Sequence, residues 1–197
     1  MSGLHPRYPL RTERLELRPH RMEDLDDLVD FHSDPDVVRY VPWPVRDRDQ
    51  TRVALESKLE QDRLTTEGQW LVLAIELRET KTVIGVVLLK WVSEAGRQGE
   101  IGYALHAGYQ GKGLASEAAR EMLRLGFEEL GLHRIVAVLD DRNTASAQLL
   151  ERLGMRREAH HLQTAWFKDE WCNEFVYALL KDEWLNGRSG PAASGQE

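Results

Sequence analysis

The sequence predicts a single α+β domain built on a mixed, mostly antiparallel sheet, and two stretches carry this prediction. Residues 70–105 contain three segments rich in valine, leucine and isoleucine, separated by short polar turns, which is typical of an antiparallel meander. Residues 114–139 contain an apolar helical stripe followed by a short, continuously apolar strand, which indicates a strand, a helix and a parallel strand in succession. Helix-period segments before residue 70 complete the α+β pattern.

The composition is that of a globular domain with an acidic surface. The chain has 197 residues, a formal net charge of −7 and 42% apolar residues. We expect one domain over residues 12–185, an N-terminal extension over 1–11 and a disordered tail over 186–197. The acidic total argues against a nucleic-acid partner. The single cysteine, Cys172, excludes an internal disulfide and a thiolate zinc cluster, so no metal is expected. No apolar run suits a membrane span, which predicts no membrane partner and a cytoplasmic location.

The first half of the chain predicts short helices followed by the meander. The expected helices are Met22 to His32, a brief turn from Asp36 to Val41, and a helix from Asp47 or Asp49 to about Thr65. The expected strands are Thr12 to Pro19, Trp70 to Leu77, Thr82 to Val92 and Glu100 to Leu105.

The second half alternates helices and strands. The expected helices are Leu114 to Leu130 and Thr144 to Leu153, the latter capped by Asn143. The expected strands are Arg134 to Leu139, His160 to Phe167 and Asn173 to Leu180.

The segment from Gln110 to Ala115 is the strongest functional signal. Its two glycines lie between a strand and a helix, where backbone N–H groups without intrahelical partners and the helix dipole favour an anion such as phosphate. A P-loop requires Ser or Thr after its lysine, but Gly113 follows Lys112. A dinucleotide fingerprint requires a third Gly or Ala where Ser116 stands, and its usual place is near the start of a chain. The sequence therefore favours neither of these two nucleotide sites.

Gln110-Gly111-Lys112-Gly113-Leu114-Ala115 resembles the pyrophosphate loop Gln/Arg-x-x-Gly-x-Gly/Ala of the GNAT superfamily, the acetyl-CoA-dependent N-acetyltransferases. Three other segments resemble motifs of the superfamily: Glu100 to Leu105, Asn143 to Ser146 and Leu149 to Met155. Two further segments, Thr12 to Arg18 and Leu179 to Trp184, resemble the opening and closing of the branch that contains the ribosomal-protein N-terminal (RimJ/RimL-like) acetyltransferases. The resemblance covers about residues 12–184. It implies the GNAT fold, in which the sheet is splayed at its centre, helices cover both faces and the pantetheine arm of the cofactor lies in the gap.

The resemblance also assigns cofactor-binding residues. The backbone of Gln110, Gly111, Lys112, Gly113, Leu114 and Ala115 binds the CoA pyrophosphate, although the Lys112 side chain need not touch phosphate. Leu105 and His106 lie where the strand splays, and the Leu105 N–H donates to the thioester carbonyl and then to the oxyanion. His106 is a loop residue in the alternative interpretation.

Two positions are candidates for catalysis, each with a structural alternative. Asn143 and Ser146 line the cofactor, and Ser146 is a candidate to protonate the leaving thiolate; the alternative is that both only cap a helix. Glu100 is the candidate general base, directly or through a water, and the alternative is a surface glutamate. Asp169 and Glu174 are weaker candidates for the base. The aromatic residues Tyr40, Trp43, Trp166 and Trp171 are candidates for the wall of the acceptor pocket, with simple packing as the alternative.

The implied reaction is direct attack of a free amine on acetyl-CoA. An α-amine of pKa ~8 is neutral in about one molecule in ten at pH 7, whereas a lysine amine is neutral in about one in a few thousand, a difference of roughly 3 kcal/mol. The first expectation for the acceptor is therefore a protein or peptide N-terminus. The alternatives are a small-molecule amine (a polyamine, an amino acid or an antibiotic) and a non-catalytic acyl-CoA-binding domain. The resemblance also makes a homodimer an expectation.

Overall fold

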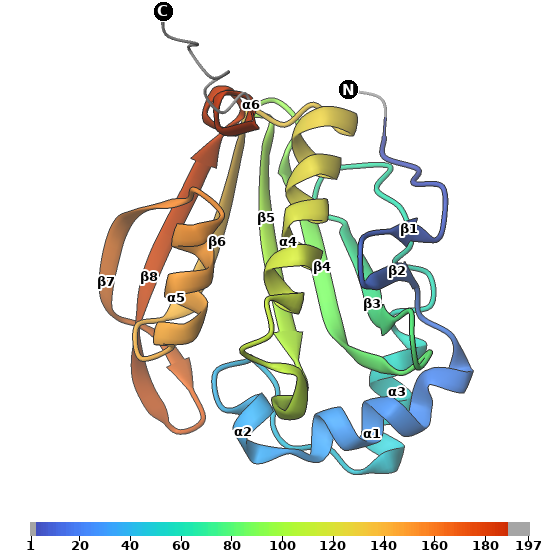
Figure 1. The fold of residues 1–197 in the computed structure, drawn as a ribbon. Coiled ribbons are helices and arrows are strands. Elements are labelled where there is room, and N and C mark those ends of the chain that lie inside the picture. Colours follow the sequence, from blue (N-terminus) through green and yellow to red (C-terminus); the bar gives the residue numbers. More distant parts are fainter. Residues whose placement is uncertain (1–2, 189–197) are drawn as a thin grey trace, which may run out of the picture.

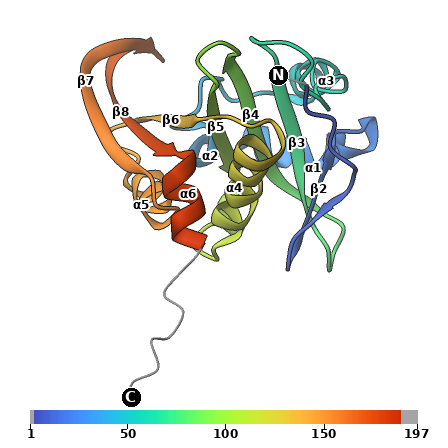
Figure 2. The same ribbon diagram turned by 90° about the horizontal axis from the view of Figure 1, so that it is seen from above.

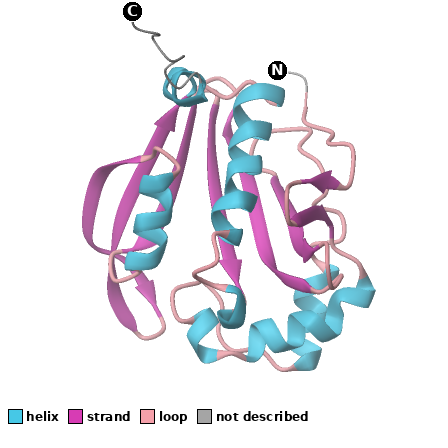
Figure 3. Ribbon diagram, in the orientation of Figure 1, coloured by secondary structure: helices cyan, strands magenta, loops and turns pink. Residues whose placement is uncertain are grey.

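The computed structural model describes residues 3–188, which form one eight-stranded sheet with helices on both faces (Figures 1 and 3). The strand order is β1-β2-β3-β4-β5-β6-β8-β7, and all neighbours are antiparallel except β5 and β6. The strands are β1 (Leu10–Arg11), β2 (Leu15–Pro19), β3 (Trp70–Leu77), β4 (Val83–Ser93), β5 (Gln98–Leu105), β6 (Arg134–Asp140), β7 (Arg156–Phe167) and β8 (Glu170–Leu180).

The sheet is splayed at its centre. The parallel pair β5 and β6 is in register only at Gln98 with Arg134, Gly99 with Ile135, and Glu100 with Val136. Beyond Glu100 the two strands diverge, and the separation is visible between the green and gold strands (Figure 1). The predicted parallel partner of the 134–139 strand and the predicted splay are therefore both confirmed.

Two groups of helices cover the two faces, as the view from above shows (Figure 2). One face carries η1 (Met22–Asp24), α1 (Leu25–Ser33), α2 (Pro35–Val38) and α3 (Arg48–Glu56). The other face carries α4 (Leu114–Arg124) with its π-helical continuation η3 (Leu125–Glu129), α5 (Thr144–Arg152) and α6 (Lys181–Arg188). A further short 3₁₀ turn, η2 (Ala107–Tyr109), joins β5 to the glycine loop.

Strand alternation divides the core between these faces. Ile101 and Leu105 on β5 belong to the core beneath α4, whereas Ala104 belongs to the core beneath α1 and α3. Ala118 and Ala119 of α4 have no exposed surface, and their small side chains allow the helix to lie close to the sheet. The start of α4 is thus fixed beside the end of β5.

Three differences from the sequence prediction are the most pronounced. The helix expected to reach about Thr65 ends at Glu56, because the chain turns there and Leu64 forms a two-way backbone bridge with Leu4. The 156–167 strand starts four residues before the predicted His160. α6 was not expected as a helix, although Trp184 on it is buried and donates to Glu128.

The two chain ends of the described region also pack against the domain. Residues before 12 contribute β1 to the sheet and the buried side chains of Leu4 and Leu10 to the core. At the other end, residues 186–188 belong to α6. The predicted disorder of 189–197 lies outside the described residues.

Candidate active site

The glycine loop presents unpaired backbone donors at the start of α4. Gly111 and Gly113 have φ of 73° and 77°, and Gly113 is the residue that precedes the helix. The first turn of the helix closes with the Glu117 N–H donating to the Gly113 carbonyl at 3.1 Å, so the N–H groups of Leu114, Ala115 and Ser116 have no intrahelical acceptor. These donors and the helix dipole suit a diphosphate.

Side chains of the loop hold its shape. The Gln110 side-chain amide donates to the Leu105 carbonyl at 2.9 Å, which ties the loop to the end of β5. The Lys112 ammonium donates to the Gly108 carbonyl at 2.8 Å and lies over the Tyr109 ring, so it supports the loop from within. His106 accepts from the Gly108 N–H at 3.1 Å through Nδ1. The side chains of His106 and Lys112 therefore have structural roles, and neither residue lines the cavities described below.

An arginine of the N-terminal segment clamps the loop from outside. Arg14 donates to the Lys112 carbonyl and to the Glu117 carboxylate, both at 2.8 Å. Thr12 donates to the same carboxylate at 2.5 Å. Burial raises the pKa of Glu117, but the hydrogen bonds from Thr12 and Arg14 outweigh it and hold that pKa below its usual value. Sequence reasoning missed this clamp, because about a hundred residues separate Arg14 from the loop.

Two cavities meet at the splayed centre of the sheet. The first, of about 590 Å³, is lined by the glycine loop and by one side of α5, and we call it the cofactor cavity. The second, of about 550 Å³, is lined by β5, β6, β8 and the loop after α2, and we call it the acceptor cavity. Residues lining both define a junction: Tyr40, Val41, Tyr103, Asn143 and Ser146.

The junction contains backbone and side-chain donors. The His106 N–H donates to the Ile84 carbonyl across β4, so by strand alternation the Leu105 N–H points away from β4 and towards the gap. The Asn143 side chain accepts from the Ser146 N–H at 3.1 Å, so the predicted helix cap forms. Tyr103 donates to the Ser146 carbonyl at 3.3 Å, and burial raises the pKa of its phenol to about 12, which keeps it a donor at neutral pH.

Tyr103 is a site residue that the sequence did not reveal. Its alternation with Ile101 and Leu105 indicated only an apolar strand face. The splay exposes that face to both cavities, and no local pattern in the sequence marks this change.

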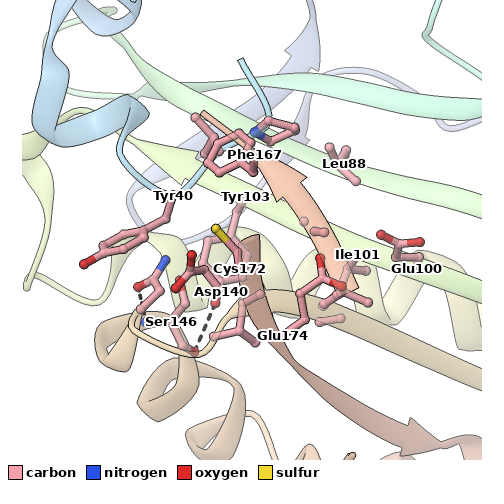
Figure 4. A pocket seen from close by; sticks show the side chains of 18 of the residues that line it. Tyr40, Leu88, Glu100, Ile101, Tyr103, Asp140, Ser146, Phe167, Cys172 and Glu174 are labelled. Atoms are coloured by element: carbon pink, nitrogen blue, oxygen red, sulfur yellow. Dashed lines mark hydrogen bonds between the residues drawn. The ribbon is translucent and has the colours of Figure 1, made fainter. Parts of the chain in front are cut away.

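The acceptor cavity contains the carboxylates of Glu100, Asp140 and Glu174 (Figure 4). Burial raises the pKa of Glu100; the charge of Lys90 opposes this rise, and the charge of Glu174 adds to it. Asp140 is paired with Arg142 at 2.6 Å. Glu100 lies three residues before the junction residue Tyr103 on β5, about 10 Å along the strand, and five residues before Leu105, about 17 Å. At that distance Glu100 reaches the junction only through intervening groups such as water.

The aromatic residues predicted for the acceptor wall are only partly brought together. Tyr40, Trp43 and Trp166 line the acceptor cavity. Trp171 stacks edge-on against Trp166 but does not itself line the cavity, and Asp169 lies in the β7–β8 turn. Cys172 lines the cavity, and burial raises the pKa of its thiol, which disfavours a nucleophilic role.

A sequence model described as "Acetyltransferase (GNAT) domain" matches residues 14–156, which include the glycine loop and both sides of the junction. The chain belongs to the GNAT acetyltransferase family. Its members use acetyl-CoA, and the free donors at the start of α4 suit the diphosphate of that cosubstrate.

Relatives and solved structures agree with this membership. The chain is 35% identical to the "Uncharacterized N-acetyltransferase p20" of Bacillus licheniformis over 176 residues, 89% of this chain and 97% of that protein. It is 27% identical to the "[Ribosomal protein uS5]-alanine N-acetyltransferase" of Escherichia coli (strain K12), over 93% of this chain and 96% of that protein. A crystal structure of a GNAT-family acetyltransferase from Bacillus anthracis superimposes with a TM-score of 0.78 at 30% identity, covering 88% of this chain and 98% of that one.

Residues 3–188 contain neither a membrane-spanning helix nor a metal-ligand cluster. None of the helices described there is both long and apolar enough to cross a membrane. Within the same residues, no three His, Cys, Asp or Glu side chains are grouped as a metal site would require.

Proposed function

We propose that this N-acetyltransferase transfers the acetyl group of acetyl-CoA to the α-amine of a protein or peptide N-terminus, in a complex that holds both substrates at once. The observation that carries the proposal is the meeting of the cofactor and acceptor cavities at Tyr103 and Ser146. A thioester whose diphosphate binds at the start of α4 can extend to this junction, and an amine can approach it from the acceptor cavity. Direct attack then requires no covalent enzyme intermediate.

The chain's own groups divide the work of the reaction. The amine nitrogen forms a bond to the thioester carbon, and the Leu105 N–H stabilises the oxyanion that develops. The C–S bond then breaks, the Ser146 hydroxyl or the neutral Tyr103 phenol donates its proton to the departing thiolate, and the nitrogen of the new amide gives its extra proton back to that oxygen directly or through water. Glu100 accepts the proton of the incoming ammonium through water, which accounts for its distance from the junction.

Two considerations favour an α-amine as the acceptor. A distant base acting through water can supply only modest help with deprotonation, and an α-amine needs roughly 3 kcal/mol less of it than a lysine amine at pH 7. A relative that is 27% identical is named as an alanine N-acetyltransferase of ribosomal protein uS5, so the acceptor in its name belongs to a protein. Both considerations concern the acceptor alone, since the acetyl donor follows from the family.

The test is a comparison of acceptors that differ only in the position of the amine. Purified protein and acetyl-CoA are incubated with short peptides that have a free N-terminus and no lysine, and with the same peptides N-formylated and carrying one lysine. Thiol release and the mass of the peptide are measured. We expect acetylation at the free N-terminus only. Acetylation of the lysine alone, or of amino acids, polyamines and aminoglycosides but not of peptides, contradicts the proposed acceptor.

A further inference from the structure

The charged side chains that line the acceptor cavity are all acidic. Its lining contains Glu100, Asp140 and Glu174, and among the described residues that line it there is no lysine, arginine or histidine. The Arg142 guanidinium neutralises Asp140 through two hydrogen bonds, at 2.8 and 2.6 Å. The negative charge that remains in the cavity therefore belongs to Glu100 and Glu174.

These two carboxylates have no close partner within residues 3–188: neither forms a hydrogen bond or an ion pair there. Lys90 lies opposite Glu100 on the neighbouring strand, but its ammonium is placed over the Trp70 ring, 4.7 Å from the centroid. Glu174 lies near enough for its charge to raise the pKa of Glu100, and both side chains point into the cavity from β5 and β8 (Figure 4). The Lys90 charge acts on Glu100 without pairing with it, so two half-buried carboxylates with no ion pair within residues 3–188 favour a cation beside Glu174.

The two carboxylates are also separated from the junction. Glu100 precedes Tyr103 by three residues on β5, about 10 Å along the strand. The cavity wall over this distance is apolar, formed by Leu88, Ile101 and Val138 among others. A ligand that reaches from the junction to the carboxylates thus needs an apolar spacer and a second positive charge.

We propose that Glu174, together with Glu100, forms a subsite for a second cation, and that the preferred acceptor is a primary amine with another positive charge about 10 Å from the attacking nitrogen. This inference rests on the proposed acetyl transfer and narrows its substrate class. Two kinds of molecule carry a primary amine and a second positive charge at this spacing: a peptide with a basic side chain near its N-terminus, and a linear diamine or polyamine.

Matched acceptors test the subsite. The small-molecule pair is octylamine and α,ω-diaminooctane, and the peptide pair is Ser-Ala-Lys-Gly and Ser-Ala-norleucine-Gly. For the wild type we expect kcat/KM to be about 10-fold higher for the dicationic member of at least one pair, the size of one charge-assisted hydrogen bond in a partly open cavity. The responding pair identifies the source, and added salt should reduce the ratio.

Variants assign the effect to the subsite. Glu174→Gln should bring the ratio close to one by lowering kcat/KM of the dicationic member much more than that of the monocationic member, because it removes one charge and keeps the shape. Asp169→Asn is the control: it removes the same charge from the β7–β8 turn, outside the cavity lining, and should keep the wild-type ratio. Equal kcat/KM for both members of both pairs in the wild type overturns the proposal, as does a ratio that Glu174→Gln does not change.

A binding measurement keeps the subsite distinguishable from the acetyl transfer itself. The same ligands are titrated into CoA-loaded protein, and the thermal midpoint is followed. If diaminooctane binds more tightly than octylamine only when Glu174 is present, yet no amine is acetylated, the subsite stands and the proposed reaction fails. If amines are acetylated without preference for a second charge, the reaction stands and the subsite fails.

Discussion

Replacing Arg14 by alanine should weaken acetyl-CoA binding, although Arg14 lies about a hundred residues before the loop that it affects. Its guanidinium holds the Lys112 carbonyl and neutralises Glu117, the carboxylate in the first turn of α4. Without it the loop loses a hydrogen bond, and an uncompensated negative charge remains beside the site for a diphosphate.

The size of this effect follows from the exposure of the contacts. The Arg14 side chain is 44% exposed, so its ion pair with Glu117 contributes at most about 1 kcal/mol. The hydrogen bond to the Lys112 carbonyl contributes about 0.5–1 kcal/mol more. If both contributions favour the loop conformation that binds the cosubstrate, the dissociation constant of acetyl-CoA should rise about 2- to 30-fold.

Isothermal titration calorimetry at two salt concentrations measures this change. Glu117→Gln in the Arg14→Ala background should recover part of the affinity, because it removes the uncompensated charge, and the recovery should shrink at high salt. Arg11→Ala is the matched control, since Arg11 is an exposed arginine of the same segment that pairs with Glu16. If Arg14→Ala binds acetyl-CoA as the wild type does, or if Glu117→Gln recovers nothing, the clamp does not act as described.

Three further predictions concern single positions. Gly113→Ala and Gly131→Ala should each cost about 1–2 kcal/mol of unfolding free energy because both glycines have φ near 75°, but only Gly113→Ala should weaken acetyl-CoA binding; equal affinities in calorimetry would count against the loop. The pKa of Glu100 is raised above its ordinary value of 4.5, so kcat/KM should begin to fall at a pH above 4.5 as the pH is lowered. Glu100→Gln should be slower and should not show this acidic decrease in kcat/KM. If the variant keeps the pH profile of the wild type, Glu100 does not take part in the reaction. His32 is fully buried, which lowers its pKa from 6.5 to about 3, so stability should fall as pH drops below 6.5, by about 2 kcal/mol at pH 5. Denaturant unfolding should show a smaller loss for His32→Phe, and an identical pH dependence refutes this assignment.

The positions that sequence predicted well are those governed by local interactions. The start of α4 at Leu114 follows from Gly113 and the apolar stripe behind it, and the cap at Asn143 follows from a side chain that bonds three residues ahead. The 70–77 strand was predicted at its observed bounds, because alternation and the turn after it are properties of neighbouring residues.

The errors occurred where distant contacts decide the structure. No nearby residue ends the predicted third helix: the Leu4–Leu64 bridge and the return to β3 require the chain to leave the helix at Glu56. α6 has only a weak helical pattern, and it is held by the burial of Trp184 and its bond to Glu128.

The sequence by itself determined the family and the acetyl donor, and it predicted the loop that we propose for the diphosphate, because the loop's chemistry depends on a few consecutive backbone groups. Only the tertiary structure decided which side chains face the reacting groups. The splay of β5 from β6 exposes Tyr103 to both cavities, and the pairing of β6 with β8 places Glu174 beside the cavity that Glu100 enters from β5. These residues come from strands far apart in the chain, and their common orientation arises from sheet register, which no short stretch of sequence specifies.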